Sequence, residues 1–169
     1  HSDATIRELA MAVIGAPGPR DELIEQYREA LTMEGDANRG SEVFRRVCAN
    51  CHRVGEVGHE VGPSLASFRN RGPEALLLNV LDPNREINPQ FLAYGAETTD
   101  GRQVVGMIGG ETASSVTLKM AEGKVETLRR AELETLSSTG VSLMPEGLEK
   151  DVDVQAMADL LAFLLQGDG

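Results

Sequence analysis

The sequence predicts a mainly α-helical fold, a helical core around a bound group, with an inserted small antiparallel β-sheet or barrel. Apolar residues recur at helical spacing in residues 36–90 and 139–169. Residues 91–138 instead contain short alternating segments separated by turn dipeptides, a pattern typical of antiparallel hairpins. We therefore expect a helical hairpin at residues 1–35, a helical core made of 36–90 and 139–169, and a β insertion at 91–138.

The composition limits the classes of protein to consider. The chain has 169 residues and is 41% hydrophobic, which is enough to build a core. Its net charge of −11 argues against nucleic-acid binding, which needs a basic face. No run of about 18 apolar residues occurs, so no membrane span is predicted. The chain opens with His1 and shows no signal peptide, and we expect a mature form or an excised domain.

The N-terminal segment is predicted to form two short helices. They cover residues 3–14 and 20–33, and residues 15–19 (Gly-Ala-Pro-Gly-Pro) break the chain between them. A hairpin this small cannot bury both of its apolar faces by itself. It either packs on the rest of the chain or is the last unit of an upstream helical repeat.

Three helices are predicted for the core. The first begins at Asp36 as N-cap and places Gly40 and Phe44 on one face. The second begins at Pro73 and stops at Asp82. The last covers residues 153–166, where Leu160 and Phe163 are placed to meet Gly40 and Phe44.

Four or five short strands are predicted in the insertion, with turns at Asp100-Gly101 and Glu122-Gly123. They are residues 91–98, 102–108, 115–120, 125–128 and 133–137. We expect the insertion to pack over the edge of a bound group or to dock a partner. It contains no constellation of catalytic residues.

The strongest chemical signal is Cys48-Ala49-Asn50-Cys51-His52, because Cys-x-x-Cys-His is the attachment motif of a c-type haem. Cys48 and Cys51 would form thioethers with the two haem vinyl groups, and His52 would bind the iron. These are the only two cysteines of the chain, so one covalent haem c is predicted.

Two other chemistries share part of this motif. A redox dithiol also has Cys-x-x-Cys, but it belongs at the start of a helix after a strand, whereas residues 38–47 are predicted to be helical. A zinc site would need two further ligands, for which only histidines and carboxylates remain. A chance occurrence of the motif is the third alternative.

Other residues near the motif are candidates for holding the haem. A ligating histidine needs an acceptor for its second ring nitrogen, and the Pro63 carbonyl is our candidate. Arg69 and Arg71 are candidates for binding the haem propionates, although either could be ordinary solvated surface. His59 could be a second ligand, but an exposed loop histidine is the simpler interpretation.

Met144 is the candidate for the sixth iron ligand, since a thioether opposite histidine is usual in electron-transfer c haems. Of the six methionines, it alone falls in a predicted loop, where the following Pro145 favours an extended backbone. The other five fall in predicted helices or strands, where methionine usually fills core space. They are Met11, Met33, Met107, Met120 and Met157.

The chain resembles class I cytochromes c, and specifically the haem-binding domain family found at the C-termini of large planctomycete and verrucomicrobial proteins. The matching segments lie within residues 36–166 and are residues 40–44 (Gly-Ser-Glu-Val-Phe), 48–54 (Cys-Ala-Asn-Cys-His-Arg-Val), 61–65 (Val-Gly-Pro-Ser-Leu), 81–83 (Leu-Asp-Pro), 142–148 (Ser-Leu-Met-Pro-Glu-Gly-Leu) and 158–164 (Ala-Asp-Leu-Leu-Ala-Phe-Leu). The resemblance implies Met144 as ligand and a strand-rich insertion before the methionine loop. It also implies fusion to a sugar-dehydrogenase-like propeller and to helical repeats, with residues 1–35 as a repeat remnant.

The predicted function is electron transfer through one c-type haem with His52 and Met144 as axial ligands, and no catalytic residues are predicted. The expected partners are a fused or docked dehydrogenase as donor and a downstream carrier as acceptor. Covalent haem attachment normally takes place outside the cytoplasm, so we expect a periplasmic or otherwise exported protein. The competing class is a haem-based sensor with a labile sixth ligand. A peroxidase-like enzyme is less favoured because no distal acid–base residue accompanies the motif.

Overall fold

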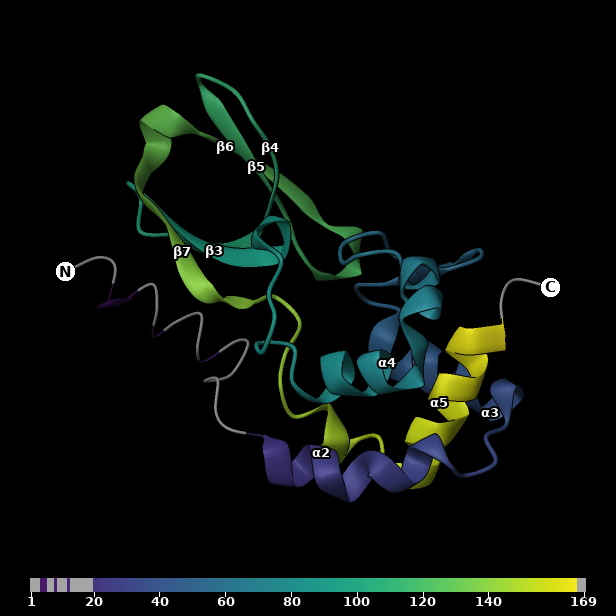
Figure 1. Cartoon of the computed structure of the whole chain (residues 1–169). Coiled ribbons are helices and arrows are strands. Elements are labelled where there is room, and N and C mark those ends of the chain that lie inside the picture. Colours follow the sequence, from purple (N-terminus) through teal and green to yellow (C-terminus); the bar gives the residue numbers. More distant parts are fainter. Residues whose placement is uncertain (1–3, 6–7, 9–11, 13–19, 167–169) are drawn as a thin grey trace.

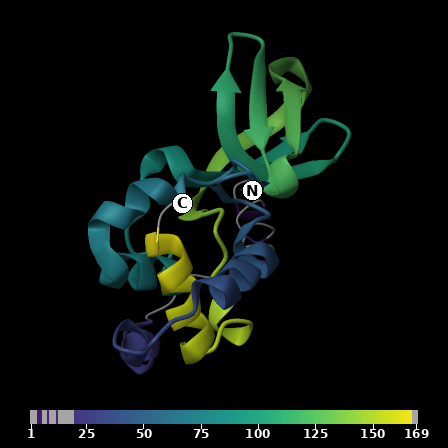
Figure 2. The ribbon, with the colours of Figure 1, turned by 90° about the vertical axis from the view of Figure 1, so that its right-hand side faces the viewer.

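A computed structural model of the chain describes residues 4–5, 8, 12 and 20–166. The helices gather in one part of the molecule, and the larger β-sheet projects from that part (Figure 1). The same division is visible after a quarter turn (Figure 2). In the described ranges the chain thus consists of helices and two antiparallel sheets. The sheets form a larger share of the fold than the prediction of a mainly α-helical protein implied.

The α-helices are α2 (Asp21–Tyr27), α3 (Ala37–Val43), α4 (Gly72–Leu81) and α5 (Val154–Gln166). A π-helix, η2 (Phe44–Cys48), continues α3, and short 3₁₀ helices are η1 (Arg28–Leu31), η3 (Leu65–Arg71), η4 (Pro89–Phe91), η5 (Ala121–Gly123), η6 (Arg130–Glu132) and η7 (Leu148–Lys150). The strands are β1 (Arg53–Val54), β2 (Val57–Gly58), β3 (Leu92–Thr98), β4 (Gln103–Glu111), β5 (Ser115–Lys119), β6 (Val125–Arg129) and β7 (Leu133–Ser142).

The predicted helix at residues 3–14 lies mostly outside the described residues. The second predicted helix, at residues 20–33, is present as α2 followed by η1. The helices predicted from Pro73 and over residues 153–166 correspond to α4 and α5. The 3₁₀ helix η3 was not predicted, because its sequence has no apolar repeat long enough to show a helical period.

Helix α3 begins where the sequence predicts, because Asp36 caps it. The Asp36 carboxylate accepts hydrogen bonds from the Asn38 and Arg39 amides at 2.8 and 3.1 Å. The helix then continues through the wider π-helical turn η2 and ends at Cys48. The cap and the continuation together lead the chain directly into the cysteine motif.

Helices α3 and α5 cross in close contact at Gly40. A Cβ atom at Gly40 would lie 2.0 Å from the Asp159 carbonyl oxygen and 2.8 Å from the Phe163 Cβ. The rings of Phe44 and Phe163 pack with their centroids 5.5 Å apart. The predicted crossing is therefore present, although the backbone of Asp159 rather than the side chain of Leu160 faces the glycine.

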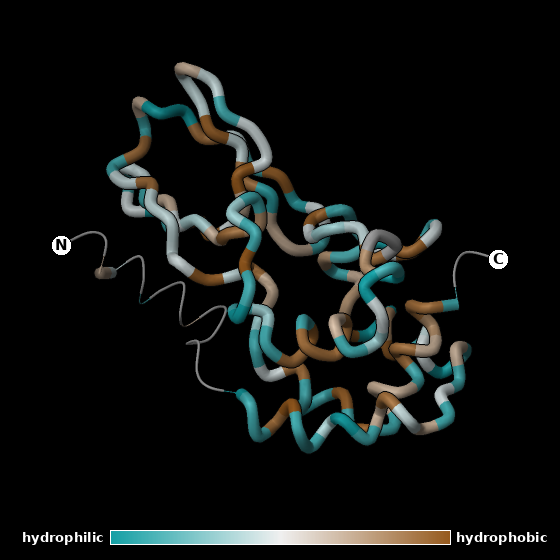
Figure 3. Tube along the Cα trace, viewed as in Figure 1, coloured by the Kyte–Doolittle hydropathy of each residue, from teal (hydrophilic) through white to brown (hydrophobic). Residues whose placement is uncertain are grey.

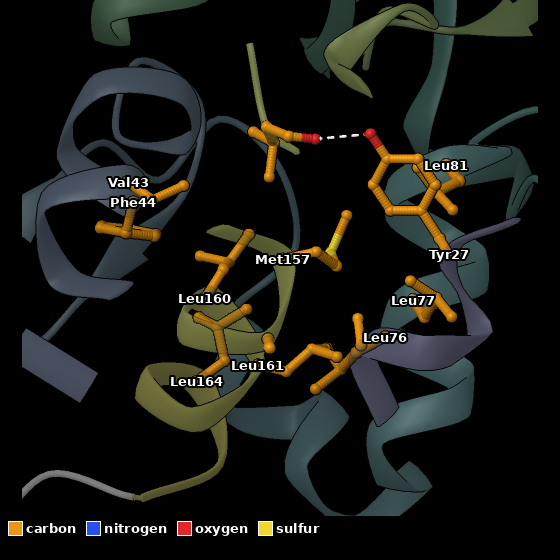
Figure 4. Packing of buried hydrophobic residues seen from close by; sticks show 13 residues of the cluster. Tyr27, Val43, Phe44, Leu76, Leu77, Leu81, Met157, Leu160, Leu161 and Leu164 are labelled. Carbon is orange, nitrogen blue, oxygen red and sulfur yellow. Dashed lines mark hydrogen bonds between the residues drawn. The ribbon is translucent and has the colours of Figure 1, made fainter. Parts of the chain in front are cut away.

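The helices α2, α3, α4 and α5 share one hydrophobic core (Figure 4). Its largest fully buried side chains include Phe44, Leu77 and Leu160. Tyr27 joins this core from α2 and donates a hydrogen bond from its hydroxyl to the Val152 carbonyl at 2.8 Å. Helix α2 thus packs on the other helices of the core.

The larger sheet is antiparallel with strand order β6-β5-β4-β3-β7. The β3–β4 turn contains Asp100 and Gly101, as predicted, and Gly101 has a φ of 83°. The last strand continues to Ser142, beyond its predicted end at residue 137, and its final residue pairs with Leu92 at the start of β3. The chain therefore enters and leaves the sheet at neighbouring positions.

The sheet has its own apolar cluster, in which Val116 and Leu118 are fully buried. The turn between β5 and β6 contacts the cysteine motif, because the Glu122 amide donates to the Asn50 carbonyl at 2.7 Å. Figure 3 shows apolar and polar residues interspersed along the helices and strands. Among the described residues, no helix has the length and apolar character needed to cross a membrane.

Candidate haem-binding site

The end of helix η2 brings the cysteine motif together. The Cys51 and His52 amides both donate to the Cys48 carbonyl, at 3.0 and 2.9 Å. This tight turn places Cys48, Cys51 and His52 in the wall of one cavity of about 510 Å³. A cavity of this size lies in the range of cofactor sites in proteins.

His52 is oriented by the loop that follows it. Its ring is buried, and Nδ1 lies 3.0 Å from the Pro63 carbonyl oxygen, the acceptor predicted from the sequence. A carbonyl can only accept, so Nδ1 carries the proton and Nε2 keeps its lone pair. Burial lowers the pKa of His52, and the bond to Pro63 opposes this effect in part. Burial thus favours the neutral imidazole, which is the form that binds a metal.

Gly62 leaves room for the His52 ring. A Cβ atom at Gly62 would lie 2.5 Å from the ring carbon Cε1 and 2.9 Å from Nδ1. Real Cβ atoms do not approach other atoms so closely, so the loop can pass over the imidazole only with glycine at this position. The loop thus forms a cradle shaped to the histidine.

The cysteine side chains lack the stabilised thiolate of a redox dithiol. Burial raises the pKa of Cys48 to about 12, with a further contribution from Cys51, and burial also raises the pKa of Cys51. Redox dithiols instead have a cysteine whose thiolate is stabilised. No cluster of three or more histidine, cysteine or acidic side chains that could hold a metal ion occurs among residues 20–166 or the four described residues before them.

Met144 lines the same cavity as the cysteine motif. It follows the end of β7, and its amide donates to the Ser142 hydroxyl at 3.1 Å. The remaining walls are largely apolar and come from η3, α4, the residues around η4, the loop of Met144 and α5. They include Leu65, Phe68, Leu76, Val80, Ile87, Phe91, Leu143 and Leu164. The donor set and these walls fit a haem.

The two candidate propionate partners lie in different places. Arg71 is exposed and lines the haem cavity. Arg69 does not line it, but donates from Nε to the Leu164 carbonyl at 3.0 Å and borders a separate hollow with Arg53. His59 is exposed and is not part of the cavity wall.

The sequence predicts Met107 to be a core residue of a strand, yet it lines the haem cavity from β4 and is only 5% exposed. Its position shows that the sheet contributes directly to the cavity wall. Strand periodicity could place Met107 on one face of the sheet, but not identify what that face covers.

Comparisons with known proteins match the part of the chain that carries the cysteine motif. The family model described as cytochrome c oxidase, cbb3-type, subunit III, matches residues 35–105. A cytochrome c-553-like protein of Synechocystis is 32% identical over 72 residues, which are 38% of this chain and 68% of that protein. Cytochrome c of Stellaria longipes is 44% identical over 39 residues, which are 22% of this chain and 36% of that protein.

The relatives and the site agree on the cofactor and the chemistry. Both indicate electron transport through haem c. The haem is bound covalently at Cys48 and Cys51 of the Cys-x-x-Cys-His motif. The chain belongs to the cytochrome c family, and its features are those of a class I cytochrome c.

Proposed function

We propose that this protein transfers single electrons with His52 and Met144 as the two axial ligands of its haem iron. One observation carries the proposal: both side chains line the cavity that also contains Cys48 and Cys51. Histidine with methionine is the usual ligand pair of electron-transfer c haems. The bound haem supplies an iron that alternates between the ferric and ferrous states.

The residues of the chain bind and shield this group. Cys48 and Cys51 attach it covalently, and the Pro63 carbonyl holds His52 in the tautomer that can ligate. The apolar walls limit the access of water. Arg71, at the cavity wall, is the better placed of the two arginines for binding a propionate. None of these roles makes or breaks a bond in a substrate.

The ligand assignment is tested with Met144→Ala in the haem-loaded protein. The oxidised wild-type protein should show the weak far-red band that reports sulfur bound to ferric iron, and the variant should lack it. Met120→Ala is the matched control, because Met120 packs against the apolar cluster of the sheet and does not line the cavity. A band that survives Met144→Ala would exclude Met144 as the ligand.

The same samples separate electron transfer from the alternative of a haem-based sensor. A stable sixth ligand blocks the iron, so reduced wild-type protein should bind carbon monoxide slowly. Rapid binding by untreated protein would favour the sensor.

We infer further that the chain is the haem domain of a larger exported protein of the planctomycete and verrucomicrobial type. In this view residues 36–90 and 139–169 form the cytochrome core, 91–138 are an insertion, and 1–35 derive from upstream helical repeats. The donor would be a fused or docked dehydrogenase, and a downstream carrier would accept the electron. The resemblance of residues 142–148 to that family supports this inference. Haem reduction on adding sugar to the full-length parent protein would test it, and no reduction with any sugar would contradict it.

A further inference from the structure

The loop that carries Met144 is held by one asparagine from a distant part of the chain. The Asn84 side-chain carbonyl accepts a hydrogen bond from the Ser142 amide at 2.8 Å. Its NH₂ group donates to the Glu146 carboxylate at 2.7 Å. Ser142 and Glu146 each lie two positions from Met144, so Asn84 bonds to the loop on both sides of the methionine.

Glu146 is fixed in turn by Arg20 at the N-terminus of α2. Arg20 donates from Nη1 to the second oxygen of Glu146 at 3.3 Å, and it also pairs with Glu149. The Arg20 and Glu146 side chains are only 13% and 8% exposed. Solvent therefore screens this ion pair less than it would screen a surface pair, and loss of Arg20 would leave the Glu146 carboxylate as a buried charge.

A second set of ion pairs joins the residue next to Asn84 to the residue next to Arg20. Arg85, next to Asn84, donates to the Asp82 carboxylate at 2.9 Å and also pairs with Asp21, next to Arg20. The chain after α4 and the start of α2 are thus joined to each other as well as to the methionine loop. Several hydrogen bonds and ion pairs therefore hold the loop, rather than a single contact from one side chain.

We propose that Arg20 and Asn84 are positioning residues for Met144. With Ser142 and Glu146 they form what we call the methionine-loop clamp. Residues 143–147 belong to no helix or strand, so the loop has no backbone ladder to fix it. Side chains that orient a metal ligand from behind typically change metal binding about 10- to 100-fold when they are removed. The inference rests on the proposed ligation by Met144.

The first test replaces Asn84 in the haem-loaded full chain. Asn84→Ala removes both loop bonds, and we expect the reduced protein to bind carbon monoxide about tenfold faster, since displacement of Met144 becomes easier. The far-red band of the oxidised protein should weaken. Asn38→Ala is the control, because Asn38 is exposed on α3 and far in sequence from the loop. Equal rates and bands for the Asn84 and Asn38 variants would overturn the proposal.

A paired exchange tests the hydrogen bond itself. In Asn84→Asp alone, a carboxylate faces Glu146, and we expect the loop to loosen as in Asn84→Ala. Combining Asn84→Asp with Glu146→Gln reverses the donor and the acceptor and keeps the net charge. The new amide at position 146 can donate to the new carboxylate while its carbonyl still accepts from Arg20. The charge of Glu146 is lost, so the double variant should bind carbon monoxide more slowly than Asn84→Asp but not as slowly as wild type. A double variant as fast as Asn84→Asp would contradict the clamp.

The outcomes distinguish the clamp from the proposed ligand. If Met144→Ala keeps the far-red band, the ligand assignment is wrong and the clamp falls with it. If Met144→Ala loses the band but Asn84→Ala leaves the carbon monoxide rate unchanged, only the clamp is wrong. If Asn84→Ala does not fold, Arg20→Gln replaces it, and a rate equal to wild type would refute the role of the ion pair.

Discussion

Replacing Gly40 by alanine adds one methyl group at the crossing of α3 and α5. The new Cβ would lie 2.0 Å from the Asp159 carbonyl oxygen, 2.6 Å from the carbonyl carbon and 2.8 Å from the Phe163 Cβ. Ordinary carbon–oxygen contacts are about 3.3 Å or longer. Two of the three atoms belong to the backbone of α5, so the helices must separate by about 1 Å or more at this point.

Two opposing effects set the size of the loss. Forcing extra volume into a packed site costs about 1 to 3 kcal/mol, and a backbone that cannot rotate away places this site near the upper end. Alanine favours the helix over glycine by about 1 kcal/mol. The free energy of unfolding should therefore fall by about 2 kcal/mol. For a protein of this size, the melting temperature should fall by about 4 to 8 °C.

The assay is thermal unfolding of the haem-loaded variant, followed by far-ultraviolet circular dichroism and by haem absorbance. Gly110→Ala is the control, because a Cβ at Gly110 meets no atom within 4 Å and its φ is not in the left-handed region. That variant should change stability by no more than about 0.5 kcal/mol. A Gly40→Ala variant as stable as wild type would show that the close crossing does not exist in solution.

Two further predictions concern the acid stability of the helical core and the histidine cradle. Hydrogen bonds and charge from Arg39 hold the pKa of buried Asp159 at about 2, below its ordinary value of 3.8. The pair therefore stabilises the fold above pH 3.8, and this contribution is lost as the pH falls through about 2. Since Arg39 is more than half exposed, we expect about 1 to 2 kcal/mol. Asp159→Asn should lower stability at pH 7 and flatten its dependence on pH between 4 and 2 in urea unfolding, and an unchanged pH profile would refute the assignment. Gly62→Ala should push the His52 ring out of line, and the haem absorption spectrum of the variant should depart from that of wild type, whereas an identical spectrum would contradict the close approach.

Local sequence signals predicted much of the helical part and the attachment half of the site. Asp36 and Asp153 cap their helices because their short carboxylates accept from amides a few residues later in the chain. Asp100 and Gly101 specify their turn in the same local way. The spacing of Cys48, Cys51 and His52 is likewise contained within five consecutive residues.

The parts of the site that depend on contacts between distant residues could not be predicted from the sequence. Asn84 follows a predicted helix stop, and nothing nearby in sequence indicates that its side chain reaches Ser142 and Glu146. Met107 looks like any inward residue of a strand, since the pattern does not tell the cavity wall from the core of the sheet. Such contacts are determined by how the helices and strands pack together. The spacing of apolar residues within one helix or strand does not specify that packing.

The pairing of Leu92 with Ser142 bears on how this protein can change in evolution. Because the sheet begins and ends at adjacent positions, the turn between β4 and β5 at residues 112–114 can be lengthened, shortened or exchanged without redirecting the helices on either side. That freedom ends where the sheet meets the haem cavity at Met107 and the cysteine motif at Asn50. The sheet is thus a module with a variable β4–β5 turn and a constrained base.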